Sequence, residues 1–98
     1  MEETMILVAR GHQETVELFP NKLKIKGLNH ELEIFLNKIS AVLFVHASGI
    51  VPGSMEIFFS GLERMEHKFN HLSFSAEQQP EFLKIRAAIE NMIYQSEK

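Results

Sequence analysis

The chain contains no cysteine, which excludes disulfide bonds and thiolate metal sites. This absence fits a reducing compartment, and we predict a cytoplasmic protein. Long apolar runs are also missing, because the longest, residues 39–45, is far shorter than the roughly 20 residues of a membrane helix. Residues 1–4 are acidic where a signal peptide would be basic, so we expect neither a membrane span nor a secretory signal.

Positive charge is scarce as well. The chain has 10 Lys and Arg residues against 13 carboxylate residues, and its net charge is −3. Nucleic-acid binding needs clustered Lys and Arg to neutralise phosphates, so no nucleic-acid partner is expected. The same deficit disfavours attachment to anionic lipid by charge alone, which makes membrane binding the less favoured alternative.

Metal ligands and catalytic groups are thinly spread. There is no aspartate, and the histidines fall in predicted turns, in a polar loop and at strand ends, where we expect structural roles: His12, His30, His46, His67 and His71. The sequence contains no glycine-rich phosphate loop, no nucleophile elbow and no grouped acid, base and nucleophile. We therefore predict a protein that is not an enzyme, with no catalytic residues, no metal and no cofactor.

Three early segments alternate polar and apolar residues, the period-2 pattern of half-buried strands: residues 14–19, 22–26 and 31–35. In an antiparallel meander of these strands, Leu18 lies beside Leu23, and Leu23 lies beside Ile34. A bulge at the turn formed by Pro20 and Asn21, where asparagine tolerates a left-handed conformation, would shift this pairing by one residue.

Charged side chains on the other face of the meander agree with the same pairing. It aligns Glu17, Lys24 and Glu33 across the three strands and places Lys26 against Glu31. Opposite charges at facing positions stabilise a sheet by roughly 0.2–1 kcal/mol per pair, whereas like charges destabilise it. The charged face and the apolar face therefore predict one register.

Four further strands are predicted from β-branched and apolar segments: residues 5–10, 39–46, 55–59 and 71–75. The nearly continuous apolar run 39–46 is typical of a strand buried on both faces, or of one that bends from one sheet to another. Residues 47–53 read as a loop. The polar and charged segment 61–70 is expected to form an exposed loop.

The end of the chain differs in kind. Apolar residues recur at steps of three and four, which predicts an amphipathic helix over residues 80–96 with the stripe Phe82, Ile85, Ile89, Met92 and Ile93. Ser75 followed by Gln78 has the spacing of a capping box at its start. A helix with one apolar stripe closes the open end of a rolled sheet. We therefore predict a mainly β fold, a seven-stranded antiparallel roll or barrel capped by one C-terminal amphipathic helix.

Short motifs carry a resemblance to a known family. They are residues 10–12 leading into residues 15–18, the join over residues 34–42, Pro52–Gly53 before a strand, and residues 72–78 before Phe82. In these the chain resembles small bacterial pleckstrin-homology-like (PH-like) domains, most of unknown function and some followed by a short C-terminal helical module. The resemblance implies a single PH-like domain over residues 1–98.

Two functions remain open at this point. The preferred one is a non-catalytic binding module that recognises a protein partner or self-associates through its strand edges. Ile50 and Val51 are its candidate interaction loop, although the sequence slightly favours their tucking into the mouth of the roll. The alternative is a membrane-surface module that recognises a lipid headgroup, with Arg10 and His12 as candidate ligand-binding residues. The lysine stripe faces glutamates, so we expect a solvated, paired sheet face there: Lys22, Lys24 and Lys26.

Overall fold

The structure, a computed structural model, describes residues 4–60 and 70–96. The described elements are, in chain order, β1 (Leu7–Arg10), β2 (Thr15–Leu18), β3 (Lys22–Lys26), β4 (Glu31–Phe35), the 3-10 helix η1 (Leu36–Lys38), β5 (Ile39–Val45), β6 (Gly53–Phe59), β7 (His71–Phe74) and α1 (Gln79–Ser96). Residues 61–69 of the predicted exposed loop, with His67, lie outside the described residues. Asn70 at its end is fully buried, and its side-chain amide donates a 2.7 Å hydrogen bond to the carbonyl of Ile57.

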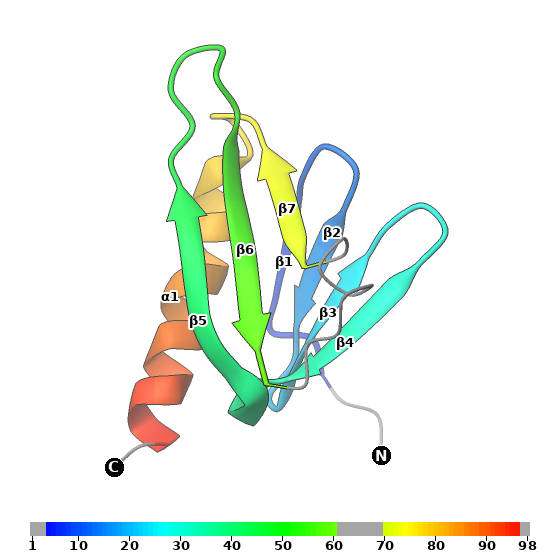
Figure 1. The fold of residues 1–98 in the computed structure, drawn as a ribbon, viewed down its shortest axis with the longest axis vertical. Coiled ribbons are helices and arrows are strands. Elements are labelled where there is room, and N and C mark those ends of the chain that lie inside the picture. The colour runs from blue at the N-terminus through cyan, green and yellow to red at the C-terminus, as the bar shows by residue number, and fades with distance from the viewer. Residues whose placement is uncertain (1–3, 61–69, 97–98) are drawn as a thin grey trace.

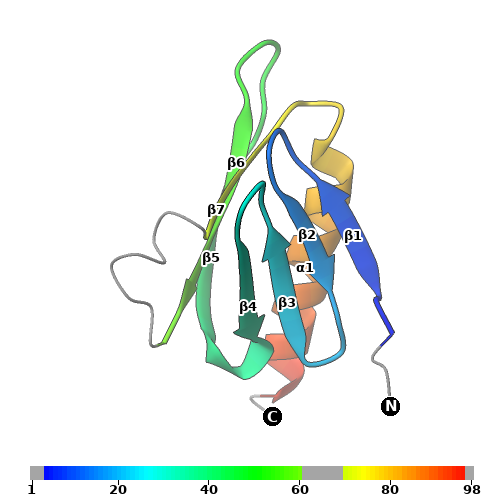
Figure 2. The ribbon, with the colours of Figure 1, turned by 90° about the vertical axis from the view of Figure 1, so that its right-hand side faces the viewer.

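The strands form two antiparallel sheets, ordered β1-β2-β3-β4 and β5-β6-β7 (Figure 1). Within the described residues no ladder joins the two sheets, so they are open and not the closed seven-stranded barrel that the sequence allowed. The chain crosses between them through η1, where buried Leu36 turns into the core. β4 and β5 belong to different sheets, and the two strands diverge from this crossing instead of pairing, as the views in Figures 1 and 2 show together.

The register of the first sheet is the predicted one. Leu18 pairs with Leu23 and Leu23 with Ile34, while Lys24 stands between Glu17 and Glu33. No bulge interrupts the β2–β3 turn, which the Phe19 amide closes with a 2.9 Å hydrogen bond to the Lys22 carbonyl. Within the described residues no residue other than glycine has a positive φ, so Asn21 does not take the left-handed conformation.

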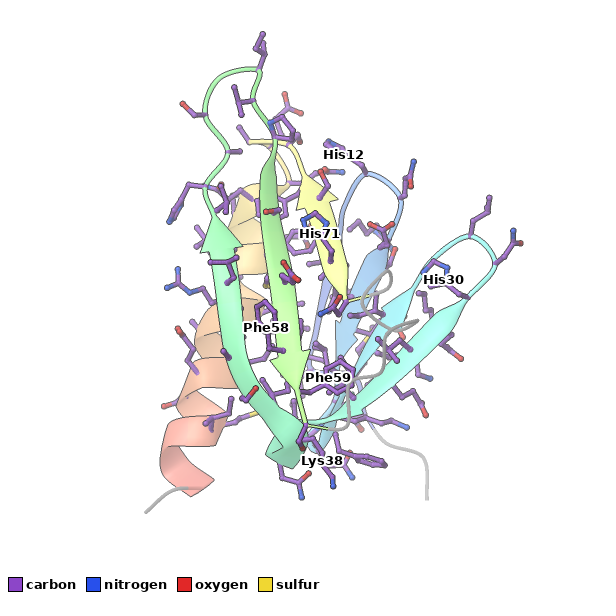
Figure 3. The ribbon with its side chains drawn as sticks, viewed as in Figure 1. His12, His30, Lys38, Phe58, Phe59 and His71 are labelled. Atoms are coloured by element: carbon purple, nitrogen blue, oxygen red, sulfur yellow. The ribbon has the colours of Figure 1, made fainter. Side chains whose placement is uncertain are left out.

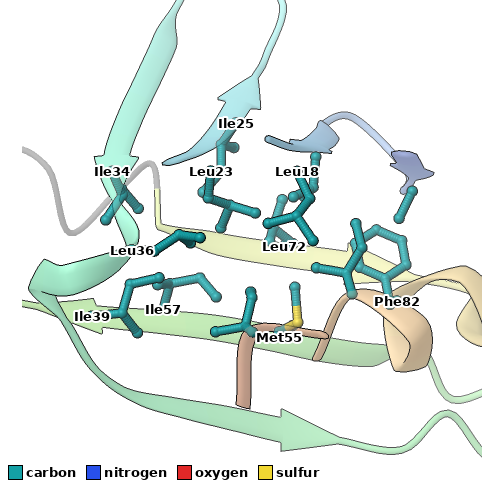
Figure 4. Close-up of a cluster of buried hydrophobic side chains, with 14 of the residues drawn as sticks. Leu18, Leu23, Ile25, Ile34, Leu36, Ile39, Met55, Ile57, Leu72 and Phe82 are labelled. Carbon is teal, nitrogen blue, oxygen red and sulfur yellow. The ribbon is translucent and has the colours of Figure 1, made fainter. Parts of the chain in front are cut away.

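The core lies between the inner faces of the two sheets and the apolar stripe of α1 (Figure 4). The largest fully buried side chains come from all three, and they are Phe74, Phe82, Leu18, Leu23, Ile25, Ile34, Met55, Ile57, Leu72, Ile85, Ile89 and Val16. The rings of Phe74 and Phe82 stack with their centroids 4.5 Å apart, which joins α1 to the three-stranded sheet. The predicted helical stripe is confirmed, with Met92 and Ile93 at its partly buried end.

The start of α1 is held by the predicted capping box. The Ser75 amide donates to Gln78 Oε1 at 2.9 Å, and the Gln78 amide donates to Ser75 Oγ at 3.3 Å. The same turn is bound to both sheets, because Gln78 Nε2 donates to the Gly11 carbonyl and the Ala47 amide donates to Gln79 Oε1. The capping residues thus set where the helix enters the gap between the sheets.

Two strand boundaries differ from the prediction by two residues. β1 begins at Leu7 instead of residue 5, and Met5 and Ile6 before it are exposed. β6 begins at Gly53, which the sequence placed in a loop. Gly53 is buried, and a Cβ there would lie 2.5 Å from Cε1 of Phe74 and 2.6 Å from the Val45 carbonyl. The strand can begin at position 53 because glycine, which has no side chain, fits between these neighbours.

Strand β5 is the largest correction. It is the edge of its sheet and is not buried on both faces. Only its inner side chains, such as Val42 and Phe44, pack against the core, whereas Leu43 and Val45 are about half exposed on the outer face. The absence of charged residues in β5 therefore does not mean that both of its faces are buried.

A matched pair of leucine truncations tests the core. Leu23 is fully buried and Leu28, in the β3–β4 turn, is 92% exposed. We expect Leu23→Ala to lower the free energy of unfolding by about 2–5 kcal/mol, because it leaves a cavity. Leu28→Ala should change it by less than about 0.5 kcal/mol. Urea denaturation of both variants measures the difference, and similar losses would contradict this core.

Candidate functional site

An apolar surface covers the outer side of β5 and the hairpin that follows it. Leu43 is 53% exposed, Val45 48%, Ile50 100% and Val51 60%, and we call these four residues the β5 surface. The hairpin that carries Ile50 and Val51 extends past the rest of the molecule at the top of Figure 1. Phe58 of β6, the register partner of Ala41, lies beside β5 on the same face (Figure 3). Exposed apolar side chains that gather on one part of a surface can mark contact sites in soluble proteins.

The hairpin tip exposes its apolar residues for a local reason. Ser48 and Val51 exchange backbone hydrogen bonds of 3.0 and 2.8 Å, which closes a two-residue turn. Gly49 takes the positive φ of 59° that the first central position of a type II′ turn requires. This tight turn keeps Ile50 at the tip, away from the core. The expectation that Ile50 or Val51 tucks into the mouth of the roll is therefore wrong, and both residues are available for contact.

The backbone of β5 offers unused hydrogen-bonding groups. The Ile57 amide donates to the Asn70 carbonyl at 3.0 Å, so the backbone groups of Ile57 point from β6 towards β7. Val42 is the register partner of Ile57, and its N–H and C=O therefore point away from β6. Strand residues alternate in direction, so the N–H and C=O of Phe44 also point to the free edge. Within the described residues no backbone hydrogen bond from another element reaches this edge.

The other three sheet edges are protected. β1 and β7 are short, with four residues each. Helix α1 packs along β1. On β7, the Ser73 carbonyl accepts a 2.9 Å hydrogen bond from the His12 amide. The β4 edge carries Glu31 and Glu33. β5 has seven residues, none of them charged and none of them proline. Proteins normally protect edges by charge, short length or coverage, so β5 is an exception in this fold.

The predicted ligand residues lie on the β1–β2 turn. Arg10 is exposed at the end of β1, and no interaction joins it to His12 in the described part of the chain. His12 Nδ1 lies 3.1 Å from Ser73 Oγ, which with the backbone bond fastens this turn to β7 (Figure 3). A Cβ at the neighbouring Gly11 would lie 2.5 Å from the Ser73 carbonyl, so the two segments are in close contact. His12 therefore takes part in a contact between the β1–β2 turn and β7.

Each lysine of the predicted stripe has a glutamate partner. Lys22 Nζ lies 3.1 Å from Glu33, Lys24 Nζ lies 3.5 Å from Glu33, and Lys24 Nζ lies 3.7 Å from Glu31. Lys26 pairs diagonally with Glu17 at 3.3 Å, although Glu31 is its register partner. The hydrogen bond from Lys22 holds the pKa of Glu33 below its ordinary value. The expectation of a paired, solvated sheet face is confirmed.

The described residues offer little for metal or membrane chemistry. They contain no group of three or more metal-ligating side chains, and no helix among them has the length and apolar character to cross a bilayer. Comparisons with protein-family models, with curated proteins and with solved structures found no match to this chain. The candidate site is therefore assigned from geometry, and it is the β5 surface.

Sequence reasoning found Ile50 and Val51 but missed Leu43 and Val45. The signal was present in residues 39–45, which contain no charge. A strand buried on both faces and an unprotected edge strand have the same composition, so only the sheet order separates the two interpretations.

The Glu33 ion pairs predict a pH dependence. Because the folded-state pKa of Glu33 is lowered, its ionised carboxylate stabilises the fold above the ordinary pKa of glutamate. This contribution is lost as the pH falls through the lowered pKa. We expect Glu33→Gln to be less stable than the wild type at neutral pH and to lose less stability on acidification. Urea denaturation at a series of pH values measures both, with the exposed Glu77→Gln as the control. Stability curves for Glu33→Gln that run parallel to those of the wild type would contradict the assignment.

Proposed function

We propose that this chain is a non-catalytic, PH-like interaction module that binds protein through the β5 surface. The order of elements supports the PH-like assignment, since a four-stranded sheet, a three-stranded sheet and a C-terminal helix follow one another as in that superfold. One observation carries the function, namely an uncharged seven-residue edge strand with half-exposed Leu43 and Val45.

The chemistry of such an edge is addition of a strand. Val42 and Phe44 present N–H and C=O groups to a partner chain, which supply the affinity of main-chain pairing. Leu43, Val45 and the hairpin tip contribute apolar area, and burial of such area stabilises by roughly 25 cal/mol per Å². Because β5 itself carries no charge, the partner segment is expected to be an extended, largely apolar strand.

Lipid-headgroup recognition has less support. A phosphate group would have to displace the glutamates that already hold Lys22, Lys24 and Lys26. His12 is engaged with Ser73. Binding to phosphoinositide vesicles that is lost in Arg10→Glu would favour the lipid function over the protein function.

Site-specific photocrosslinking tests the protein function. A photoreactive residue at Val45 in cells that naturally produce the chain should crosslink to a protein, either a partner or another copy. The same residue at Leu28, which is also apolar and exposed but lies on a hairpin of the other sheet, should crosslink much less.

A second substitution makes the test specific for the strand edge. Leu43→Lys places a charge beside the edge, and edge charges oppose strand addition. We expect it to reduce crosslinking from Val45 severalfold without unfolding the chain, because position 43 is exposed and faces Glu56 across the sheet. Equal crosslinking from positions 45 and 28, or none from position 45, would disprove the proposed surface.

A further inference from the structure

We propose that the partner of the β5 surface is a second copy of this chain, paired antiparallel along β5 about a two-fold axis at Leu43. This inference rests on the proposed function, that the β5 surface binds protein. It adds the identity of the partner and the register of the pairing.

The regular part of β5 places the axis. The β5–β6 register shifts between Ile39 and Ala41, so the strand is irregular at its start and regular from Ala41 to Val45. Leu43 is the middle residue of this regular segment. An isologous pair is built from the same residues on both copies, so a ladder that uses the whole regular segment is centred there.

The free hydrogen-bonding groups match this centre. Val42 of one copy lies opposite Phe44 of the other, and both residues point their N–H and C=O groups to the free edge. Opposed residues of this kind exchange two hydrogen bonds. The symmetric pairing therefore satisfies the edge groups of both residues in both copies.

The outer side chains match as well. Leu43 faces Leu43 of the second copy, and Ala41 faces Val45, so each facing pair is apolar. No charged residue occurs between Ile39 and Val45, and no like charges are opposed. The smaller residue of the segment lies against a larger one at both ends of the ladder.

The same register gives the exposed hairpin tip a contact. Beyond Val45 the chain runs towards η1 of the second copy, so the turn with Ile50 continues alongside that helix. A hollow of about 450 Å³ lies next to η1, and its lining combines apolar Phe35, Leu36 and Met92 with polar Asn21, Asn37 and Lys38. The strand ladder alone buries less surface than the roughly 1,200 Å² of a stable interface. We therefore expect a reversible dimer, which the contact of the hairpin tip strengthens.

Engineered cysteines test the register in a chain that has none of its own. Across the proposed axis the two residues at position 43 form a non-hydrogen-bonded pair with Cα atoms about 4.5 Å apart, within the range for a disulfide. Position 45 is the matched control, since its exposure is 48% against 53% for position 43. Its two copies would be about 13 Å apart, four residues along a strand of about 3.3 Å per residue. Under mild oxidation we expect Leu43→Cys to become mainly a disulfide-linked dimer and Val45→Cys to remain mainly monomeric.

Sedimentation of the wild-type chain provides the second measurement. The average mass should rise with concentration from 11.3 kDa towards that of a dimer, and Leu43→Lys should abolish the rise. Urea unfolding of each reduced variant verifies that it is folded. Crosslinking of both cysteine variants to the same extent, no crosslinking of Leu43→Cys, or a wild-type monomer at all concentrations would each overturn the pairing.

These outcomes separate this inference from the proposed function. If Val45 crosslinks to a different protein in cells while the purified chain stays monomeric, the interaction surface stands and the self-pairing fails. If Val45 also crosslinks to nothing in cells, both proposals fail.

Discussion

The stacked pair of Phe74 and Phe82 is the contact on which the arrangement of the two sheets depends. Their ring centroids are 4.5 Å apart, and both side chains are fully buried. The pair joins α1 to the three-stranded sheet, and a Cβ at Gly11 would lie 3.3 Å from the Phe82 ring, so the β1–β2 turn meets them at the same point. Because the sheets share no ladder in the described residues, α1 and this contact take over the role that strand pairing has in a closed barrel.

An open pair of sheets has edges, and the protection of those edges explains much of the surface. Helix α1 packs along β1, His12 fastens the first turn to β7, and glutamates line β4. The helix also reaches the inner side of β5, where the Arg86 guanidinium lies 5.3 Å from the ring centroid of Phe44. Among residues 4–60 and 70–96, no other element pairs with the edge of β5, and Leu43 and Val45 are exposed on its outer side. This difference from the other edges is why the proposed function is assigned to β5.

Prediction from the sequence succeeded where neighbours along the chain are also neighbours in space. The β2–β3–β4 meander is joined by short turns, so matching Leu23 to Leu18 and Ile34 was enough to determine its register, and the lysine–glutamate face agreed. The register did not predict every ion pair, because the Lys26 side chain extends diagonally to Glu17. The amphipathic stripe and the capping box likewise needed only local spacing. In the candidate site, the hairpin residues Ile50 and Val51 were identified, but their exposure was not.

The sequence by itself determined the strands and the C-terminal helix of this protein, the core face of the alternating strands and of the helix, and the pairing of strands joined by tight turns. It also ruled out disulfides, because no cysteine is present. Only the tertiary structure decided that β5 is an edge and that the sheets remain open. The physical reason is that a strand has the same apolar sequence whether or not another strand covers it. Coverage depends on sheet order, which is set by contacts between residues far apart in the chain, such as His12 with Ser73.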